Sequence, residues 1–361
     1  MHVLLVINNL SPGTGPFQRI IKLDKAITVS VVSLFDSQAN LIKISTQFGM
    51  DTSHIHLYGL CAKNRLIALL KLYNLVKKTK PDIIQSVHTF SDILCVFMKY
   101  FTKTPVISFE GTLINRLSFL KKYIVLFNHS LVDTVVCVSN NTYKVNTGIS
   151  NTLSKFTNRC IIYNGVDLKL IDKLACSRKL EVGCKTIGYV GDLKSVKNLT
   201  ILFQAFSKCS MINKNIRLVI VGSGPEEYFL KNLACELGIS VNFSGQISRL
   251  EVLKLLNSLD IFVMPSLVEG LSESIVQAMA SRVPVIASDI DANRELIDHN
   301  ETGLLFKSGN SDDLKHQMLK LINEEVDVDY LVNNARKYIG LNLNINDITD
   351  KYTKLYLEHL K

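Results

Sequence analysis

The chain has 361 residues, of which 47% are hydrophobic and 20% are charged. This length predicts two domains, at about 150 residues each, and the composition excludes the disordered and fibrous classes because it supplies apolar material for two cores. The net charge of +9 is uneven, since residues 1–163 carry 18 Lys and Arg against 7 Asp and Glu. This basic part indicates an anionic partner, and a solvated basic surface without a partner is the alternative.

The eight cysteines form no Cys-x-x-Cys pair, which argues against a zinc site or a redox motif and is compatible with a reducing cytosol. The opening MHVLLVINNL lacks a basic region ahead of its short apolar run, so we expect a buried strand there and not a signal peptide. No window offers the roughly 18 apolar residues that a membrane span needs.

Short apolar runs alternate with helical patterns along the chain. In chain order, the predicted strands are Val3–Ile7, Thr28–Leu34, Ile83–Ser86, Val106–Phe109, Thr134–Val138, Thr186–Val190, Ile216–Val221, Val241–Phe243, Ile261–Met264 and Val283–Ala287. Helices are predicted over Lys63–Lys80 and Asp347–Lys361, among others. This alternation is typical of βαβ units, so the sequence predicts an α/β chain with two doubly wound parallel sheets.

We place the domain boundary after Gly165, in the turn Tyr163–Asp167, where Asn164-Gly165 would supply a left-handed conformation. The prediction is an N-terminal domain over 1–165, a C-terminal domain over 166–346 and a C-terminal helix over 347–361, for which a return to the first domain is one arrangement. Because ligands bind beyond the carboxyl ends of parallel strands, the loops at those ends are the candidate site.

Two glycine loops follow strands and precede helices. In the first, Gly13 and Gly15 would let a backbone or phosphate approach the start of a helix near Phe17. Pro16 and the missing third glycine distinguish it from the dinucleotide fingerprint, and an ordinary glycine turn is the alternative. In the second, Gly222 lies in the similar sequence Val221–Glu226.

Two further loops carry charge. The loop that begins at Gly191 contains Lys194 and Lys197, and lysine at the mouth of a sheet can neutralise a diphosphate. In the loop after Pro265, Glu269 precedes a predicted helix start, and the backbone amides there would face an anion. Those amides belong to Gly270, Leu271 and Ser272, and Gln277 lies one turn further along the same helix. A solvated loop carboxylate is the alternative interpretation of Glu269.

The run PSLVEGLSESIVQAMASRVPVIASDI resembles the signature of glycosyltransferase family 4, the retaining GT-B sugar-nucleotide transferases also described as glycosyl transferases group 1. The segments YNGVD, GDLKSVKN, VGSGPEE, FSGQI and ANRELIDHNETGLLF resemble further blocks of that family in the same order. The resemblance implies the GT-B fold, in which two Rossmann-like domains face each other across a cleft. It also implies transfer of a sugar from a nucleoside-diphosphate sugar, with retention and without a metal or other cofactor. The second domain would hold the donor and the first the acceptor.

Carried over by residue, the resemblance makes Lys197 the diphosphate lysine and Glu269 the acid that contacts the transferred sugar. Gly245 to Ile247 would hold the base through the backbone. His88 would be the third catalytic residue, with Gln85 as an alternative in the uncertain register and a structural histidine as another.

The first half fits the family pattern more loosely. There the resemblance places Thr14, Glu110 and Thr112 on the acceptor side. The acceptor would be a lipid-linked or polysaccharide hydroxyl in the synthesis of a bacterial surface glycan such as capsule or lipopolysaccharide, with a UDP-sugar favoured over a GDP-sugar as the donor.

Two positions depart from the family. Asp192 stands where the diphosphate loop usually has arginine, so either Lys194 compensates for it or Asp192 points away. Gln277 replaces the second acid, and glutamine accepts a hydrogen bond from a ribose hydroxyl without charge assistance. These departures keep a second hypothesis open, a catalytically impaired paralogue that acts as a binding or partner subunit. A sugar-nucleotide epimerase of the same fold is a third, and a nicotinamide oxidoreductase is disfavoured.

Asp289-Ile290-Asp291 resembles the Asp-x-Asp metal motif of other transferases. Because it follows a buried strand and no further ligands cluster nearby, we expect no metal site there.

Two basic and apolar stretches, Lys63–Lys80 and Ser118–Phe127, predict peripheral association with an anionic membrane surface on the cytoplasmic side. The alternative is that the apolar residues of the first stretch pack on their own sheet; these are Leu66, Leu69, Leu70, Tyr73 and Val76. A nucleic-acid partner is not expected, because the basic stretches lack interleaved exposed aromatics or a known binding motif.

Overall fold

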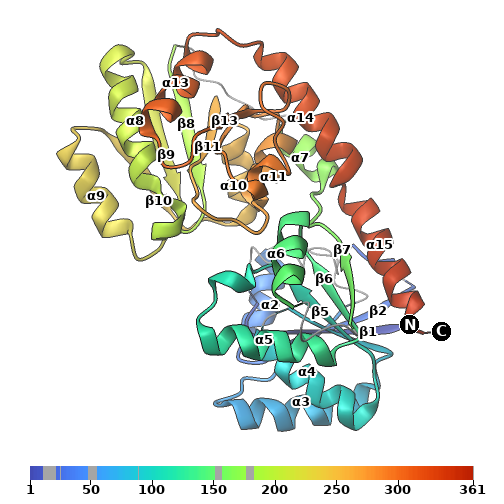
Figure 1. Ribbon diagram of the computed structural model, residues 1–361. Helices are drawn as coiled ribbons and strands as arrows, with labels where there is room; N and C mark the ends of the chain where they lie inside the picture. Colours follow the sequence, from blue (N-terminus) through green and yellow to red (C-terminus); the bar gives the residue numbers. More distant parts are fainter. Residues whose placement is uncertain are drawn as a thin grey trace. The chain divides into compact units, whose positions relative to one another are not determined.

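The computed structural model describes residues 1–10, 22–24, 26–47, 55–87, 89–150, 157–175 and 183–360. The chain forms two compact units. The first contains Met1–Gly165 together with Ile345–Lys361, and the second contains Val166–Asn344. Each is built on one parallel sheet with helices on both faces, so the predicted α/β class with two doubly wound sheets is confirmed (Figure 1).

The sheet of the first unit has the strand order β3-β2-β1-β4-β5-β6-β7, and all neighbours are parallel. Its strands are β1 (His2–Ile7), β2 (Thr28–Ser33), β3 (Ile55–Gly59), β4 (Ile83–Ser86), β5 (Val106–Glu110), β6 (Thr134–Cys137) and β7 (Asn158–Ile161). β5 and β6 are buried along their whole length and β1 from Val3 to Ile7, as expected of a parallel sheet covered on both faces.

Two helices cover one face of this sheet, α3 (Arg65–Thr79) and α4 (Thr89–Thr102). Their inner side chains pack with alternate strand residues in one apolar cluster, which includes Leu72 and Val76 of α3 and Cys95 of α4. Asn64 caps the start of α3 by accepting a hydrogen bond from the amide of Ile67. The other described helices of the chain's first half are α2 (Gln38–Gln47), the short η1 (Ile114–Arg116), α5 (Phe119–Leu131) and α6 (Asn140–Ser150).

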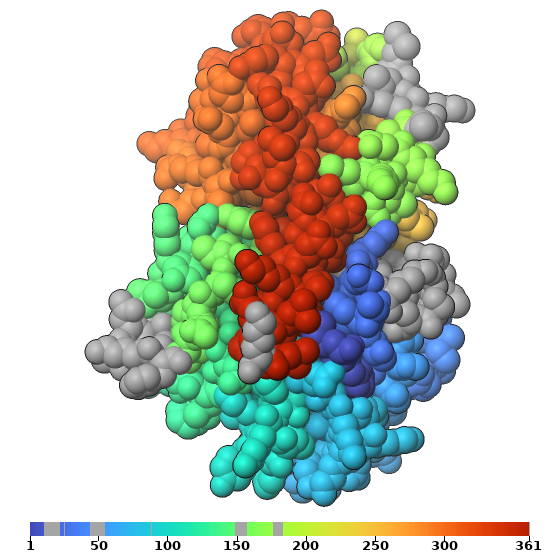
Figure 2. All heavy atoms as spheres, turned by 90° about the vertical axis from the view of Figure 1, so that its right-hand side faces the viewer, coloured from blue at the N-terminus to red at the C-terminus, as the bar shows by residue number. Residues whose placement is uncertain are grey.

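The last helix, α15 (Ile345–Glu358), belongs to the first unit. The Tyr356 hydroxyl donates to Gln85 Oε1 in the sheet, and His359 Nε2 lies 2.9 Å from Thr134 Oγ1. Figure 2 shows α15 on the surface of the first unit, beside dark-blue residues from the start of the chain. The helix begins two residues before the predicted 347.

The sheet of the second unit has the order β10-β9-β8-β11-β12-β13, again all parallel. Its strands are β8 (Lys185–Val190), β9 (Ile216–Val221), β10 (Val241–Gly245), β11 (Ile261–Met264), β12 (Val285–Ser288) and β13 (Leu304–Phe306). Its helices are α7 (Leu168–Ala175), the short η2 (Ser195–Lys197), α8 (Leu199–Ile212), α9 (Glu227–Glu236), α10 (Arg249–Leu256), α11 (Glu273–Ala280), α12 (Asp291–Arg294), α13 (Ser311–Ile322) and α14 (Val328–Asn342).

In this order β8 is followed by β9 and β10 on one side and by β11, β12 and β13 on the other. The winding direction therefore reverses between β8 and β11. In open α/β sheets the crevice at such a switch point is where ligands bind.

The sequence-based prediction missed β3, β7 and β13. Each is the edge strand of its sheet, and β3 and β7 are only partly buried, so neither shows a continuous apolar run. The strand predicted over Val283–Ala287 is observed over Val285–Ser288, because Pro284 directly precedes it. The Pro284 carbonyl accepts from the amide of Phe262.

Gly165 has a different role from the predicted one. Its φ lies outside the left-handed region, and a Cβ there would lie 2.8 Å from Ile345 Cα. The glycine is therefore needed for a close approach of two backbone segments. The amide of the next residue, Val166, donates to the carbonyl of Leu343 at 2.8 Å.

Candidate active site

Three loops at the carboxyl edge of the second sheet are joined by backbone hydrogen bonds. The Gly191 amide donates to Val221 O at 3.0 Å, and the Gly222 amide donates to Gly245 O at 2.8 Å. A Cβ on Gly222 would lie 1.9 Å from Gly191 O, and φ at Gly222 is +133°. Glycine at 222 is therefore required for these loops to meet. The loops after β8, β9 and β10 form one continuous rim.

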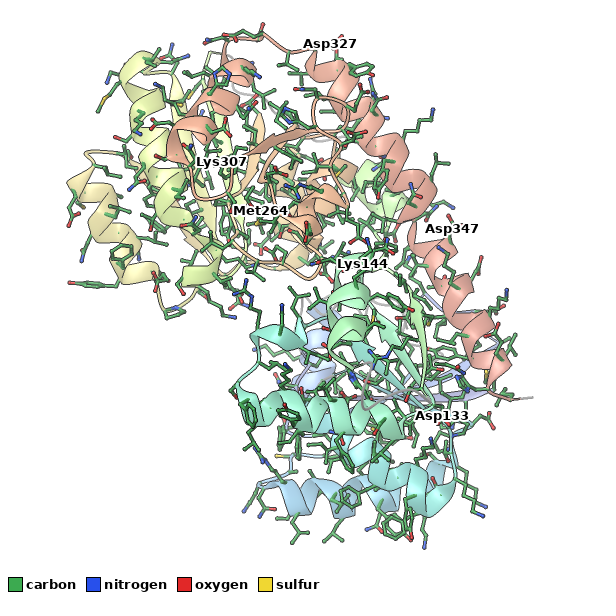
Figure 3. The ribbon with its side chains drawn as sticks, in the orientation of Figure 1. Asp133, Lys144, Met264, Lys307, Asp327 and Asp347 are labelled. Atoms are coloured by element: carbon green, nitrogen blue, oxygen red, sulfur yellow. The ribbon has the colours of Figure 1, made fainter. Side chains whose placement is uncertain are left out.

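Lys197 and Glu269 face each other at the switch point. Lys197 ends η2 after β8, and Glu269 lies in the loop after β11, whose last residue is Met264 (Figure 3). Lys197 Nζ lies 2.6 Å from Glu269 Oε1, and the side chains are 20% and 9% exposed. The two loops are also tied by the Leu267 amide, which donates to Val196 O at 2.9 Å. The two residues that the sequence singled out most strongly thus form one ion pair.

A series of hydrogen-bonded, buried polar residues supports Glu269. Ser266 Oγ donates to Glu269 Oε1 at 2.7 Å, and the Ser266 carbonyl accepts from Ser288 Oγ. Asn293 Nδ2 in turn donates to Ser288 O at 2.9 Å and lies 3.1 Å from Ser288 Oγ. Ser266, Ser288 and Asn293 are fully buried. This series links β11, β12 and α12 and restricts where the Glu269 carboxylate can lie.

The start of α11 lies directly after Glu269. Ser272 is the N-cap of α11, and its Oγ accepts from the amide of Ile275 at 3.4 Å. Gly270 and Leu271 are partly exposed, as is Gln277 one turn into the helix. A helix start of this kind carries partial positive charge and favours an anion.

Asp192 and Lys194 pair with each other on the surface. Lys194 Nζ lies 2.5 Å from Asp192 Oδ2, so the lysine does compensate for the acid. The Asp192 carbonyl accepts from the Tyr189 hydroxyl at 2.9 Å. Burial raises the pKa of Tyr189, and the negative charges of Glu269 and Asp192 raise it further, so this phenol stays a neutral donor.

Both acids of the Asp-x-Asp sequence are paired with an arginine. Arg294 Nε and Nη2 lie 2.5 Å and 2.9 Å from the two carboxylate oxygens of Asp289, and Arg294 Nη1 lies 3.3 Å from Asp291 Oδ1. Among the residues that the structure describes, no three His, Cys, Asp or Glu side chains are grouped so that they could hold a metal ion.

Sequence reasoning missed four residues of the second unit. Ser266, Ser288 and Asn293 make up the buried series described above, and the only signal for them was their position within the quoted family segments. Arg249, in the first turn of α10, had no signal. Burial lowers the pKa of its guanidinium, and the negative charges of Glu273 and Asp167 oppose that effect.

The structure describes only some of the candidate residues of the first unit. Gly13, Thr14, Gly15 and His88 lie outside the described residues. Glu110 is buried, and its Oε1 accepts from the amide of Thr112 at 2.6 Å, whereas the Thr112 side chain is exposed. The acceptor-side roles of these residues stay predictions.

Glu110 belongs to a group of buried ionisable side chains. Its Oε2 lies 3.5 Å from His129 Nε2, and Asp92 Oδ1 accepts from Ser108 Oγ at 3.0 Å. Burial raises the pKa of Glu110 to about 8 and that of Asp92 to about 7, and burial lowers the pKa of His129 to about 3. At neutral pH the glutamic acid and the histidine are therefore both uncharged.

Comparison with known proteins agrees with this geometry. Residues 176–338 match the family of glycosyl transferases group 1. The chain is 26% identical over 310 residues to the UDP-Gal:alpha-D-GlcNAc-diphosphoundecaprenol alpha-1,3-galactosyltransferase of Escherichia coli, which covers 81% of this chain and 79% of that protein. It is 22% identical over 318 residues to the capsular polysaccharide biosynthesis glycosyltransferase CapM of Staphylococcus aureus, covering 82% of each. The match to this chain spans about half the length of several other relatives.

The fold is shared with solved structures. The crystal structure of Anabaena Alr3699/HepE in complex with UDP and glucose superposes with a TM-score of 0.80 at 17% sequence identity, over 99% of this chain and 100% of that one. The chain has the GT-B fold, and residues 176–338 match the glycosyl transferases group 1 family, in agreement with the sequence resemblance.

Proposed function

We propose that the protein is a retaining glycosyltransferase that moves a sugar from a nucleoside-diphosphate sugar to a hydroxyl of a lipid-linked or polysaccharide acceptor. The observation that carries the proposal is the ion pair between Lys197 and Glu269 at the switch point of the second sheet. It places a cation for a diphosphate and a carboxylate for a sugar hydroxyl within one hydrogen bond of each other.

In the proposed reaction, Lys197 exchanges its contact with Glu269 for a contact with the donor diphosphate. The amides at the start of α11 face the same anion, because Ser272 ends the loop there. Negative charge grows on the diphosphate as the bond to the sugar breaks, so fixed donors at this position lower the barrier. Glu269, held by Ser266, would accept hydrogen bonds from the transferred sugar, and Gln277 would accept one from the ribose. No metal or other cofactor takes part in this proposal.

A UDP-sugar is the favoured donor. The galactosyltransferase relative is named for a UDP-linked donor and a diphosphoundecaprenol-linked acceptor, and the Anabaena structure contains UDP. A lipid-linked acceptor in the synthesis of a bacterial surface glycan would require the enzyme to work at the cytoplasmic face of the cell membrane.

The proposal is tested by incubating the protein with a panel of UDP- and GDP-sugars and acceptors of both kinds, and by mass analysis of the products. Glu269→Ala and Lys197→Ala should abolish transfer while the folded state is retained. Lys254→Ala, an exposed lysine on α10, is the control. Normal turnover in both site variants would refute the assignment, and the anomeric configuration of the product by nuclear magnetic resonance tests retention.

A second candidate function rests on Asp192 and Gln277. Asp192 already neutralises Lys194 in the loop expected to hold the diphosphate. Gln277, at the position expected to bind the ribose, is an uncharged acceptor. Both features weaken donor binding and favour an impaired paralogue that acts as a binding or partner subunit. Calorimetry with the same donor panel separates the two, since the impaired form would show neither donor binding nor donor hydrolysis.

A further inference from the structure

Three consecutive helices of the first unit carry more apolar side chains than their core requires. α3 contacts α4, and α4 contacts α5, so the three lie side by side (Figure 1). In α5, Val125 and Leu126 are buried in the core, whereas Phe119 and Phe127 are 78% and 64% exposed. A surface helix normally buries its apolar side chains, and α5 leaves several of them exposed.

The helices α4 and α3 also expose apolar side chains. Tyr100 and Phe101 near the end of α4 are 82% and 61% exposed, and the Phe101 ring lies edge-on to Tyr73 of α3 at 5.9 Å. On α3, Leu66 and Leu70 are 66% and 56% exposed. Figure 3 shows side chains of all three helices projecting outward.

Some apolar residues of the basic helix pack on the sheet, and others are exposed. Val76 and, in part, Leu69 and Tyr73 do pack against the first sheet, as the alternative requires. Leu66 and Leu70 do not, since the inner positions of α3 are filled by other residues such as Leu72. We call the outward surface of these helices, from residue 65 to residue 131, the α3–α5 face.

The charge on this part of the chain is mainly positive. Residues 63–131 contain eleven Lys or Arg and three Asp or Glu. Of the three acids, Asp92 and Glu110 are buried, and Asp82 accepts from the backbone nitrogen of His2 at 2.7 Å. In the sequence of α5, Lys121 and Lys122 lie between Phe119 and Tyr123, and Lys121 is exposed.

We infer that the α3–α5 face binds an anionic lipid surface and inserts its aromatic side chains between the headgroups. Aromatic and apolar side chains interleaved with lysine match the interfacial layer of a membrane, where apolar parts enter the acyl boundary and cations meet anionic headgroups. A second copy of the chain fits poorly, because a two-fold contact would bring two basic surfaces together. None of the described helices combines the length and apolar character that a membrane span requires.

The test is cosedimentation of the whole protein with vesicles of phosphatidylcholine alone or with 30% phosphatidylglycerol. The wild-type protein should pellet with the anionic vesicles and stay in solution with the neutral ones. Phe119→Ser combined with Phe127→Ser should weaken partitioning more than tenfold. Lys121→Glu combined with Lys122→Glu should weaken it at least as much, since each lysine removed costs about fivefold and the new acids add repulsion.

Matched controls lie on the second unit. Met211→Ser with Tyr228→Ser removes two equally exposed apolar side chains, and Lys254→Glu with Lys337→Glu makes the same charge change. Both controls should partition like the wild type. Circular dichroism of every variant checks that it is folded.

Three results would overturn the inference. The first is wild-type protein that does not bind anionic vesicles. The second is α5 variants that bind as well as the controls. The third is a wild-type dimer in sedimentation that Phe119→Ser with Phe127→Ser dissociates while vesicle binding is unchanged, which would assign the face to a second copy. No substrate is used, so failure here leaves the proposed transferase activity untouched.

Discussion

Lys197 and Glu269 are separated by 72 residues of sequence, and their side chains meet at 2.6 Å where the second sheet reverses its winding. Each residue neutralises the other in the absence of a donor. Binding of a diphosphate must therefore compete with Glu269 for the lysine, and this competition has consequences that can be measured.

Neutralising each partner in turn should move the affinity for UDP in opposite directions. Lys197→Met removes a charged hydrogen-bond donor, a contact of about 1.5–3 kcal/mol, and should weaken UDP binding roughly 10- to 100-fold. Glu269→Gln frees the lysine and removes a repelling charge, so it should strengthen UDP binding several-fold while transfer is lost. Isothermal titration calorimetry measures both, with Lys254→Met as the control. Weaker UDP binding in Glu269→Gln would contradict the competition.

Ser266 should act on the reaction through Glu269. Ser266→Ala removes the 2.7 Å hydrogen bond to Glu269 Oε1 and lets the carboxylate move, so kcat should fall about 10- to 100-fold. UDP affinity and KM for the donor should change little, because Lys197 is intact. Ser281→Ala is the matched control, since the buried Ser281 hydroxyl has no hydrogen-bond partner among the residues that the structure describes. Equal kcat in the two variants would mean that Ser266 does not position Glu269.

Gly222 should tolerate no side chain. In Gly222→Ala the new methyl group would overlap Gly191 O, and φ at this position is +133°, so the variant should lose roughly 3 kcal/mol or more of unfolding free energy along with donor binding. Gly340→Ala is the contrasting change in the same unit. Gly340 lies inside α14, and among the described residues the nearest atom to a new Cβ would be Leu168 Cδ1 at 3.8 Å. Gly340→Ala should stabilise the protein by about 0.5–1 kcal/mol. Urea unfolding followed by circular dichroism compares them, and a neutral Gly222→Ala would show that the loops can separate.

The stability of the first unit should decrease as pH rises from 6.5 to 8. Burial raises the pKa of Glu110 to about 8, so in this range the folded chain holds a proton that the unfolded chain has released. Folding therefore becomes less favourable by up to about 1.4 kcal/mol for each pH unit, and the slope levels off near the folded pKa. Asp92, with its pKa raised to about 7, adds a smaller slope of the same sign. The His129 pKa of about 3 contributes only below its ordinary value of 6.5.

Hydrogen exchange of the β5 amides, corrected for the intrinsic effect of pH on exchange, measures this slope within the first unit. Glu110→Gln should remove most of it, because the amide side chain does not titrate. Asp350→Asn, an exposed acid on α15, is the control and should leave it unchanged. A steep slope that persists in Glu110→Gln would assign the effect to another group.

Apart from the edge strand β10, the strands that the sequence predicted lie inside the two sheets. Ile83–Ser86, Ile216–Val221 and Ile261–Met264 are observed with the predicted bounds, because a central strand of a parallel sheet needs an unbroken apolar run. Edge strands have no such requirement. Ile55–Gly59 and Asn158–Ile161 mix polar with apolar residues, and only their pairing partners reveal them.

For the candidate site, sequence alone determined the residue types, their place after strands, and the family resemblance. These follow from local patterns, since a glycine loop or a loop lysine is recognised within a few residues. The pairing of Lys197 with Glu269, the support of Glu269 by Ser266, Ser288 and Asn293, and the outward direction of Leu66 and Leu70 were decided only by the tertiary structure. Each of these depends on which strands become neighbours and which helix face is already filled, and both are set by packing between segments distant in the chain.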